Sequence, residues 1–300
     1  MKHFRHILLL PTLLILLTTA CQQDETNVTI PDTFSVTLDI DGAQLSKAPV
    51  TADPAECIIS NVYLLFYEQG ASGVTTPGGF HKETVTGTAT SWSKSFKTTD
   101  FPNLKPYTTY DVYALVSLPG SNTTEPDEYM YKSALLALTE QQFKRSKDKR
   151  GISFTGQTSY TTGTLGPLAP INLTRTVARL DITLKSIPSG ITINDIAVEQ
   201  SADGYYLPGQ PAPAPSARKS FNAFLGDDGV TYHCYVYENV ESAAPYSLIV
   251  EGYNTASGQP LFYMGELKPD GKSTIQRNHI YNIETTVKTR SIIMSGGRLF

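Results

Sequence analysis

The sequence has little cysteine, few charged residues and almost no tryptophan. It contains three cysteines, 17% charged residues and one tryptophan in 300 residues. Apart from Cys21, the thiols are Cys57 and Cys234, too few and too far apart for a disulfide scaffold or a zinc site. We expect two separate buried thiols, with one bridge between them as the alternative. The formal net charge of −4 offers no basic face to nucleic acid.

Catalytic and cofactor motifs are equally scarce. The sequence has no Gly-x-Ser-x-Gly elbow and no phosphate-binding glycine loop at the start of a helix. His81, His233 and His279 lack a second ligand at zinc-site spacing, so we interpret them as hydrogen-bonded strand or loop histidines. Asp227-Asp228-Gly229 and Asp270-Gly271 are typical of hairpin turns, with calcium binding as the alternative. We therefore expect no catalytic residue, no cofactor and no metal site, and a protein that is not an enzyme.

The N-terminal residues are typical of an exported protein. Lys2 and Arg5 precede an apolar run from Ile7 to Leu17, and the small residues Thr18 to Ala20 follow. This order matches the charged, apolar and cleavage regions of a secretory signal. The apolar run is too short to cross a membrane as a helix, which takes about 20 residues. We expect residues 1–20 to be a signal peptide.

Cys21 stands where bacterial lipoproteins carry their lipidated cysteine. In such proteins the thiol receives a diacylglycerol and the new N-terminus is acylated, and several chains together form a stable anchor in outer-membrane lipid. An ordinary secretory signal that ends near a cysteine is the alternative. The polar, acidic stretch Gln22 to Glu25 resembles the surface-export signal of some Gram-negative lipoproteins. We assign residues 21–32 to a tether and expect the protein at the cell surface.

Strand patterns follow the tether. Phe34, Val36, Leu38 and Ile40 alternate with polar residues and share one face of a half-buried strand. The more continuously apolar run Cys57–Tyr67 is typical of a central strand covered on both faces. Further strands are predicted at Tyr110–Leu118, Thr231–Glu238, Tyr246–Tyr253, Leu261–Leu267 and Ile280–Val287. This pattern predicts an all-β fold with two antiparallel β-sandwich domains of a transthyretin-like or Greek-key type.

About 280 residues remain after cleavage, a length that suits two domains of ordinary size. Pro167 to Pro170 marks the boundary between them. We place the N-terminal sandwich at 33–168 and the C-terminal sandwich at 169–300. The capping-box arrangement Thr139-x-x-Gln142 predicts one short helix in the first domain.

Several stretches, in order along nearly the whole chain, resemble the fimbrillin family, the subunits of type V pili. The first of these stretches follow the lipidation motif (the lipobox) that ends at Cys21. They are the strand Phe34–Ile40, the basic loop Ser46-Lys47-Ala48 and the Ile/Val-rich strand Ile58–Tyr67. Later stretches with the same resemblance are Ser153–Gly156, Leu173–Ile182, Tyr235–Asn239 and Arg277–Ile283.

The resemblance implies a mechanism of assembly. Family subunits travel as lipoproteins, and a trypsin-like protease cuts the loop after the first strand, which here would fall between Lys47 and Ala48. The strand carrying Phe34 to Ile40 would then leave an apolar groove, and the C-terminal segment of a neighbouring subunit would fill it. Such strand addition satisfies the backbone groups that a missing strand leaves unpaired. The implied partners are other fimbrial subunits, the processing protease and a host or bacterial surface receptor.

The cleavage loop and the C-terminal tail depart from the family pattern. The family usually has arginine in this loop, whereas this chain has Lys47 and no arginine between Arg5 and Arg145. In the candidate tail Ile292, Ile293 and Met294 are consecutive, and we expect Ser295-Gly296-Gly297 to break the strand that they begin. A subunit that accepts a strand but donates poorly suits the end of a fimbria. We therefore expect an accessory or tip subunit with a role in adhesion, with an anchor or shaft subunit as the alternative.

A surface glycan-binding lipoprotein of a nutrient-uptake system is the competing interpretation. It would share the lipobox and the β-sandwiches, but it should also show a cluster of exposed tryptophan and tyrosine. Trp92 is the only tryptophan of the chain. The sequence therefore favours a structural subunit of a surface fimbria.

Overall fold

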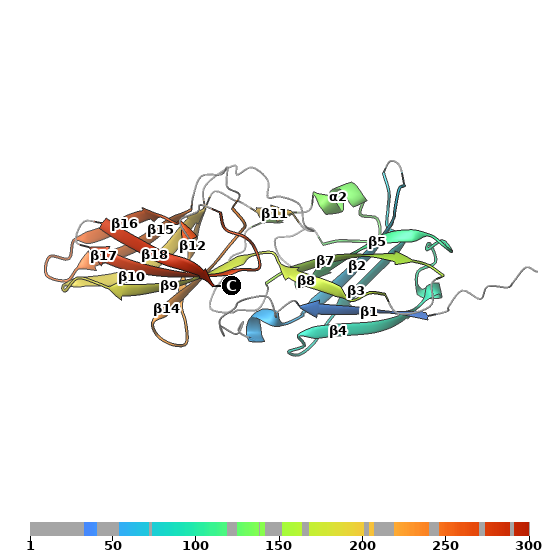
Figure 1. The fold of residues 1–300 in the computed structure, drawn as a ribbon, viewed down its shortest axis with the longest axis horizontal. Coiled ribbons are helices and arrows are strands. Elements are labelled where there is room, and N and C mark those ends of the chain that lie inside the picture. Colours follow the sequence, from blue (N-terminus) through green and yellow to red (C-terminus); the bar gives the residue numbers. More distant parts are fainter. Residues whose placement is uncertain are drawn as a thin grey trace, which may run out of the picture.

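The computed structural model consists of two β-sandwiches that lie end to end along the long axis of the molecule (Figure 1). It describes residues 33–40, 54–71, 74–118, 125–137, 139–141, 152–163, 168–200, 204–206, 219–239, 246–269, 274–288 and 291–299. Strands make up most of the regular structure in these ranges, which confirms the predicted all-β fold class. Among the same residues, none of the helices has the length and apolar character needed to span a membrane.

The first sandwich is a seven-stranded sheet folded into two layers, with the strand order β3-β2-β5-β7-β8-β1-β4. Its strands are β1 (Thr33–Ile40), β2 (Asn61–Glu68), β3 (Gly79–Thr84), β4 (Ser91–Lys97), β5 (Thr109–Val116), β7 (Phe154–Thr161) and β8 (Ile171–Arg175). Short helical segments accompany them at η1 (Pro54–Cys57), η2 (Thr98–Asp100) and α2 (Lys132–Leu136). β8 joins the two layers because one half of it pairs with β7 and the other half with β1.

Aromatic rings fill the space between the two layers. Phe34 of β1 stacks on Tyr160 of β7 with ring centroids 4.9 Å apart, and it meets Phe66 of β2 edge-on at 6.1 Å. Every side chain from Val62 to Tyr67 is buried, as expected for a central strand. The sequence predicted that this strand starts at Cys57. In the structure Pro54–Cys57 forms a helical turn, and β2 begins at Asn61.

The second sandwich packs a four-stranded sheet on a five-stranded sheet, in the orders β12-β10-β15-β16 and β13-β14-β9-β17-β18. The strands are β9 (Ala178–Ser186), β10 (Ile191–Gln200), β12 (Lys219–Asn222), β13 (Phe224–Leu225), β14 (Thr231–Val236), β15 (Ser247–Asn254), β16 (Pro260–Glu266), β17 (Ile280–Lys288) and β18 (Ser291–Leu299). Both sheets contribute buried apolar side chains to the core, among them Leu180, Ile182, Val198, Leu248, Val250 and Ile283. The four strands predicted between Thr231 and Val287 are confirmed to within two residues at each end.

Two strand pairs differ from the expected antiparallel arrangement. β1 runs parallel to β8, and β9 runs parallel to β17. The domain boundary expected after residue 168 falls just before β8, yet β8 pairs with β7 and β1 of the first sheet. The chain passes from one sandwich to the other between Arg175 and Ala178, because β9 belongs to the second sandwich.

The short helix of the first domain lies elsewhere than predicted. The capping-box position is wrong: Thr139–Gln141 is strand β6, which pairs with β11 (Gly204–Tyr206), and the helix is α2 at Lys132–Leu136. A strand distant in sequence engages the backbone groups that a helix would have used, so long-range pairing overrides the local signal. Gln142 lies outside the described residues.

The C-terminal tail also differs from the expectation. β18 pairs antiparallel with β17 from Ser291 to Leu299, so the predicted break at Ser295-Gly296-Gly297 is wrong. Glycine weakens a strand when nothing else holds it, but β17 lies opposite every residue of β18 and the ladder continues. Ile292, Ile293 and Met294 lie opposite Val287, Thr286 and Thr285.

Gly156 of β7 lies where the neighbouring strand leaves no room for a side chain. A Cβ atom at Gly156 would lie 2.6 Å from Cγ2 of Ile171 and 2.7 Å from the carbonyl oxygen of Asn172. We therefore expect Gly156→Ala to lower the free energy of unfolding by about 1–3 kcal/mol through overpacking. Gln157→Ala, on the exposed neighbour, should change it by less than about 0.5 kcal/mol. Urea unfolding of both variants provides the measurement, and equal stabilities would contradict the proposed close contact.

Candidate functional site at the first strand and the junction of the sandwiches

β1 is paired on both of its edges. It pairs antiparallel with β4 over seven residues, from Thr33 to Asp39, and parallel with β8 from Leu38 to Ile40. Four apolar side chains of this strand were predicted to share one buried face. Three of them, Phe34, Val36 and Leu38, are buried in the core. Ile40, at the end of the strand, is only partly buried.

This burial determines what removal of β1 would require. Each of the side chains Phe34, Val36 and Leu38 stabilises the fold by about 1.5–3 kcal/mol when it leaves water. Departure of the strand would also leave backbone groups of β4 and β8 without partners, which carries a further penalty. An empty groove would therefore be unfavourable unless another strand of similar apolar pattern filled it.

The predicted processing residues lie outside the described part of the chain. This applies to Cys21, Lys47 and Ala48. The described chain resumes at Pro54, the first residue of η1.

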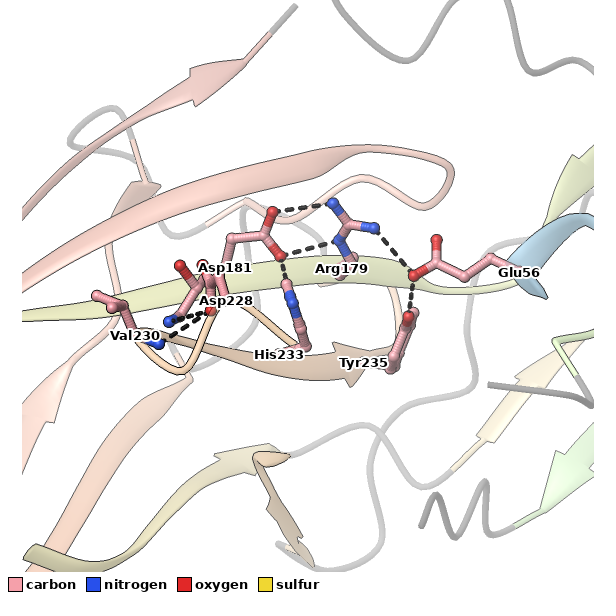
Figure 2. A network of polar contacts seen from close by, with 8 residues as sticks. Glu56, Arg179, Asp181, Asp228, Val230, His233 and Tyr235 are labelled. Carbon is pink, nitrogen blue, oxygen red and sulfur yellow. Dashed lines mark hydrogen bonds and ion pairs between the residues drawn. The ribbon is translucent and has the colours of Figure 1, made fainter. Parts of the chain in front are cut away.

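A buried polar network joins η1 to the second sandwich (Figure 2). Arg179 of β9 donates two hydrogen bonds to Asp181, Nε to Oδ1 at 2.8 Å and Nη2 to Oδ2 at 2.9 Å. Its Nη1 donates to Oε1 of Glu56 at 2.9 Å, and the Tyr235 hydroxyl donates to the same oxygen. Nδ1 of His233 lies 2.6 Å from Oδ1 of Asp181. The segment that follows the proposed cleavage loop is thus tied to the second sandwich by a buried carboxylate.

The charges of the network compensate one another. Burial alone would lower the pKa of Arg179, but the carboxylates of Glu56 and Asp181 outweigh it and raise the pKa overall. Burial alone would raise the pKa of Asp181, but hydrogen bonds from His233 and Arg179 outweigh it and lower the pKa overall. A bidentate arginine–carboxylate pair of this kind holds its partners in a fixed geometry.

An open pocket of about 340 Å³ lies beside the network, with Asp181, Asp228, His233 and Glu284 among its lining residues. Its carboxylates already have partners. Asp228 accepts hydrogen bonds from the backbone N–H groups of Val230 and Thr231, which lower its pKa to about 2, and Glu284 pairs with Lys185 at 2.9 Å. Each of these three carboxylates, of Asp181, Asp228 and Glu284, therefore has at least one partner within the fold.

The three histidines are hydrogen-bonded within the protein, as the sequence predicted. His81 on β3 contacts Glu83 at 3.1 Å, and Nδ1 of His279 contacts the carbonyl oxygen of Arg277 at 2.7 Å. Among the described residues, no group of three or more His, Cys, Asp or Glu side chains has a geometry that could hold a metal ion. Asp227-Asp228-Gly229 forms the turn between β13 and β14, as expected, and Gly229 adopts a φ of 69°.

Sequence reasoning missed the network. Arg179 and Asp181 lie two residues apart on one strand, so their side chains are expected on the same face. Glu56 is distant from both in sequence, so its contact with Arg179 could not be expected. The charged residues inside an otherwise apolar strand were the one available signal. Both lie within the stretch that resembles fimbrillins.

The architecture defines a class of protein: two β-sandwiches in tandem, with the first described strand buried between two neighbouring strands. No family model and no curated protein matches the chain. Solved structures do match, and they include fimbrial proteins and putative cell-adhesion proteins.

The tip fimbrial protein Mfa3 from Porphyromonas gingivalis, in a C-terminally truncated form, matches with a TM-score of 0.59 at 14% identity, over 89% of this chain and 99% of that one. A fimbrilin from Porphyromonas gingivalis W83 matches with 0.56 at 13% identity, over 91% and 98%. A fimbrial assembly protein from Parabacteroides distasonis matches with 0.54 at 14% identity, over 87% and 93%. The chain has the fimbrillin-family fold, which confirms the resemblance seen in the sequence.

Arg179 holds two buried carboxylates, and its removal should be costly. Arg179→Met would leave Glu56 and Asp181 buried without their cation, so we expect a loss of about 3–5 kcal/mol in the free energy of unfolding. Lys185→Met is the matched control, because Lys185 and its partner Glu284 are 52% and 51% exposed and the pair should contribute at most about 1 kcal/mol. Urea unfolding tests both. Similar losses in the two variants would show that the buried network does not stabilise the junction.

The lowered pKa of Asp181 makes part of the stability dependent on pH. A carboxylate whose pKa is lower in the folded than in the unfolded chain stabilises the fold above the ordinary value of 3.8, and this contribution disappears as the pH falls through the folded pKa. Asp181→Asn should therefore be less stable than the wild type at pH 7, and the difference should shrink below pH 3.8. Asp39→Asn, on an exposed side chain, is the control for the loss of a surface charge. A difference that stays constant down to pH 3 would contradict this expectation.

Proposed function

We propose that this protein is a structural subunit of a cell-surface fimbria, assembled by donor-strand exchange, and that it occupies an accessory or tip position with a role in adhesion. The observation that carries the proposal is the position of β1. It is the first described strand, it contributes three buried side chains to the core, and it is paired on both edges. Its removal would create a groove of the length and apolar pattern that a strand from another subunit could fill.

The lipid anchor and the processing step complete the proposal. Cys21 carries the lipid that holds the exported chain in the outer membrane, and a protease cuts between Lys47 and Ala48. The cut separates β1 from η1, and Glu56 keeps η1 attached to the second sandwich through Arg179 and Tyr235. β1 is then free to leave while the remainder of the fold stays assembled.

The C-terminal strand supports a position at the end of the fimbria. β18 is paired along its full length with β17 of its own domain, so donating it would break that ladder. A tip subunit accepts a strand and has no need to donate one. The similarity in fold to the tip fimbrial protein Mfa3 agrees with this position.

We also propose that the protein has no enzymatic activity. The buried acids of the junction are all engaged by arginine, tyrosine or histidine. Surface adhesion needs a displayed fold rather than a reactive centre.

A disulfide between β1 and β4 tests whether β1 must leave. Ser35 and Ser95 are directly opposite each other, with their hydroxyl oxygens 2.8 Å apart on the outer face of the sheet. Cross-strand positions of this kind can accept a disulfide. In a strain that lacks the native copy, the double variant Ser35→Cys/Ser95→Cys should remain outside fimbriae when oxidised and enter them after reduction. Immunogold electron microscopy and fimbrial fractionation provide the measurement.

The single variants Ser35→Cys and Ser95→Cys are the matched controls, and both should enter fimbriae as the wild type does. Label at fimbrial ends would support the tip position, and label along the length would contradict it. Normal incorporation of the oxidised double variant would show that β1 stays in place and would overturn donor-strand exchange for this subunit.

A further inference from the structure

Cys57 and Cys234 are both free thiols in very different surroundings. Cys234 on β14 is only 1% exposed, and burial raises its pKa to about 12. Cys57, the last residue of η1, is only partly buried, contrary to the expectation of two buried thiols. A thiol that reagents can reach reacts, whereas a buried one is inert.

Arg175 of β8 is directed at Cys57. Its Nη2 donates a hydrogen bond to Sγ of Cys57 at 3.2 Å, although the arginine is only 4% exposed. The guanidinium also lies over the ring of Phe154, 5.8 Å from the centroid. Arg179, by comparison, has two carboxylates as partners. Within the described ranges no carboxylate lies within ion-pair distance of Arg175, and the carboxylate of Glu56, next to Cys57, is bound to Arg179 and Tyr235.

Half of the donor pair on Arg175 is unused. Its Nε is buried and has no hydrogen-bond acceptor among the described residues. Nε and Nη2 lie on the same edge of a guanidinium and form the pair of donors with which arginine grips two acceptor atoms at once. Sγ satisfies Nη2, so an oxygen bonded to that sulfur is the second acceptor that the site lacks.

We propose that Cys57 is a site of oxidation by hydrogen peroxide and that Arg175 binds the oxygen added to its sulfur. In this step the sulfur attacks one peroxide oxygen, an S–O bond forms and the O–O bond breaks. The departing hydroxide takes up the thiol proton as water, so the product is the sulfenic acid of Cys57. Sulfur loses two electrons and peroxide gains them. The Nε donor of Arg175 holds the peroxide oxygen that is transferred to sulfur in position for attack, while the thiol proton neutralises the negative charge that develops on the departing oxygen.

The test uses the full-length chain, treated with hydrogen peroxide in the presence of dimedone, which traps sulfenic acids. Peptide mass spectrometry then separates Cys57 from Cys21 and Cys234. We expect Cys57 to be labelled about tenfold faster than Cys234, and about tenfold faster than in Arg175→Met, the effect of one charge-assisted hydrogen bond. Arg175→Lys keeps the charge without the paired donors and should be slowed as well. Lys185→Met, far from η1 in the sequence, is the control and should label Cys57 at the wild-type rate.

A second comparison holds even where the Arg175 variants fail to fold. In the wild-type protein, Cys57 should be labelled faster in the folded chain than in the same chain unfolded in urea, because only the folded state places Arg175 beside it. A faster rate in urea, or an equal rate in folded wild type and folded Arg175→Met, would overturn the proposal. Either result would identify Cys57 as an ordinary surface thiol.

Discussion

A strand that is buried on its core face and paired on both edges is costly to remove from a sheet unless another strand replaces it. β1 is such a strand, since Phe34, Val36 and Leu38 fill the centre of the first sandwich between β4 and β8. The hydrophobic effect and the backbone ladder act together here, because losing the strand exposes apolar side chains and unpaired amides at once. The proposed assembly follows from this constraint, since the same forces that hold β1 would hold a donor strand.

The junction between the sandwiches holds the segment that follows β1 by contacts that do not involve β1. Glu56 follows the proposed cleavage loop, and its carboxylate reaches across to Arg179 and Tyr235 of the second sandwich. A buried ion pair adds little net stability compared with apolar packing, but it specifies one geometry because its members cannot be left unpaired. In this protein the pair joins η1 to β9, and no residue of β1 belongs to it. Under the proposed assembly, the first domain would lose its first strand while this ion pair held the segment after the cleavage loop in place.

The strands could be predicted from the sequence wherever the local alternation of apolar and polar residues matches the burial that the tertiary structure gives them. The alternation of Phe34 to Ile40, the apolar run of β2 and the later strands β14 to β17 were all read from residue periodicity. Two local signals failed because pairing with a distant strand decided the outcome. Thr139–Gln141 pairs with β11 instead of starting a helix, and pairing with β17 keeps the glycine-containing segment of β18 in a strand. The position of β8 escaped prediction for the same reason, since a sequence cannot state which sheet a strand will join.

The sequence by itself determined the all-β class, the half-buried first strand and the resemblance to fimbrillins, because these depend on residue periodicity and on the order of motifs along the chain. Only the tertiary structure decided which residues meet. Glu56 and Arg179 are separated by more than a hundred residues, as are Cys57 and Arg175. No local pattern encodes such contacts, because they exist only when β8 and β9 bring the second half of the chain against η1. The physical reason is that a buried charged group needs a hydrogen-bonding or oppositely charged partner, and the tertiary fold decides which residue lies close enough to be that partner.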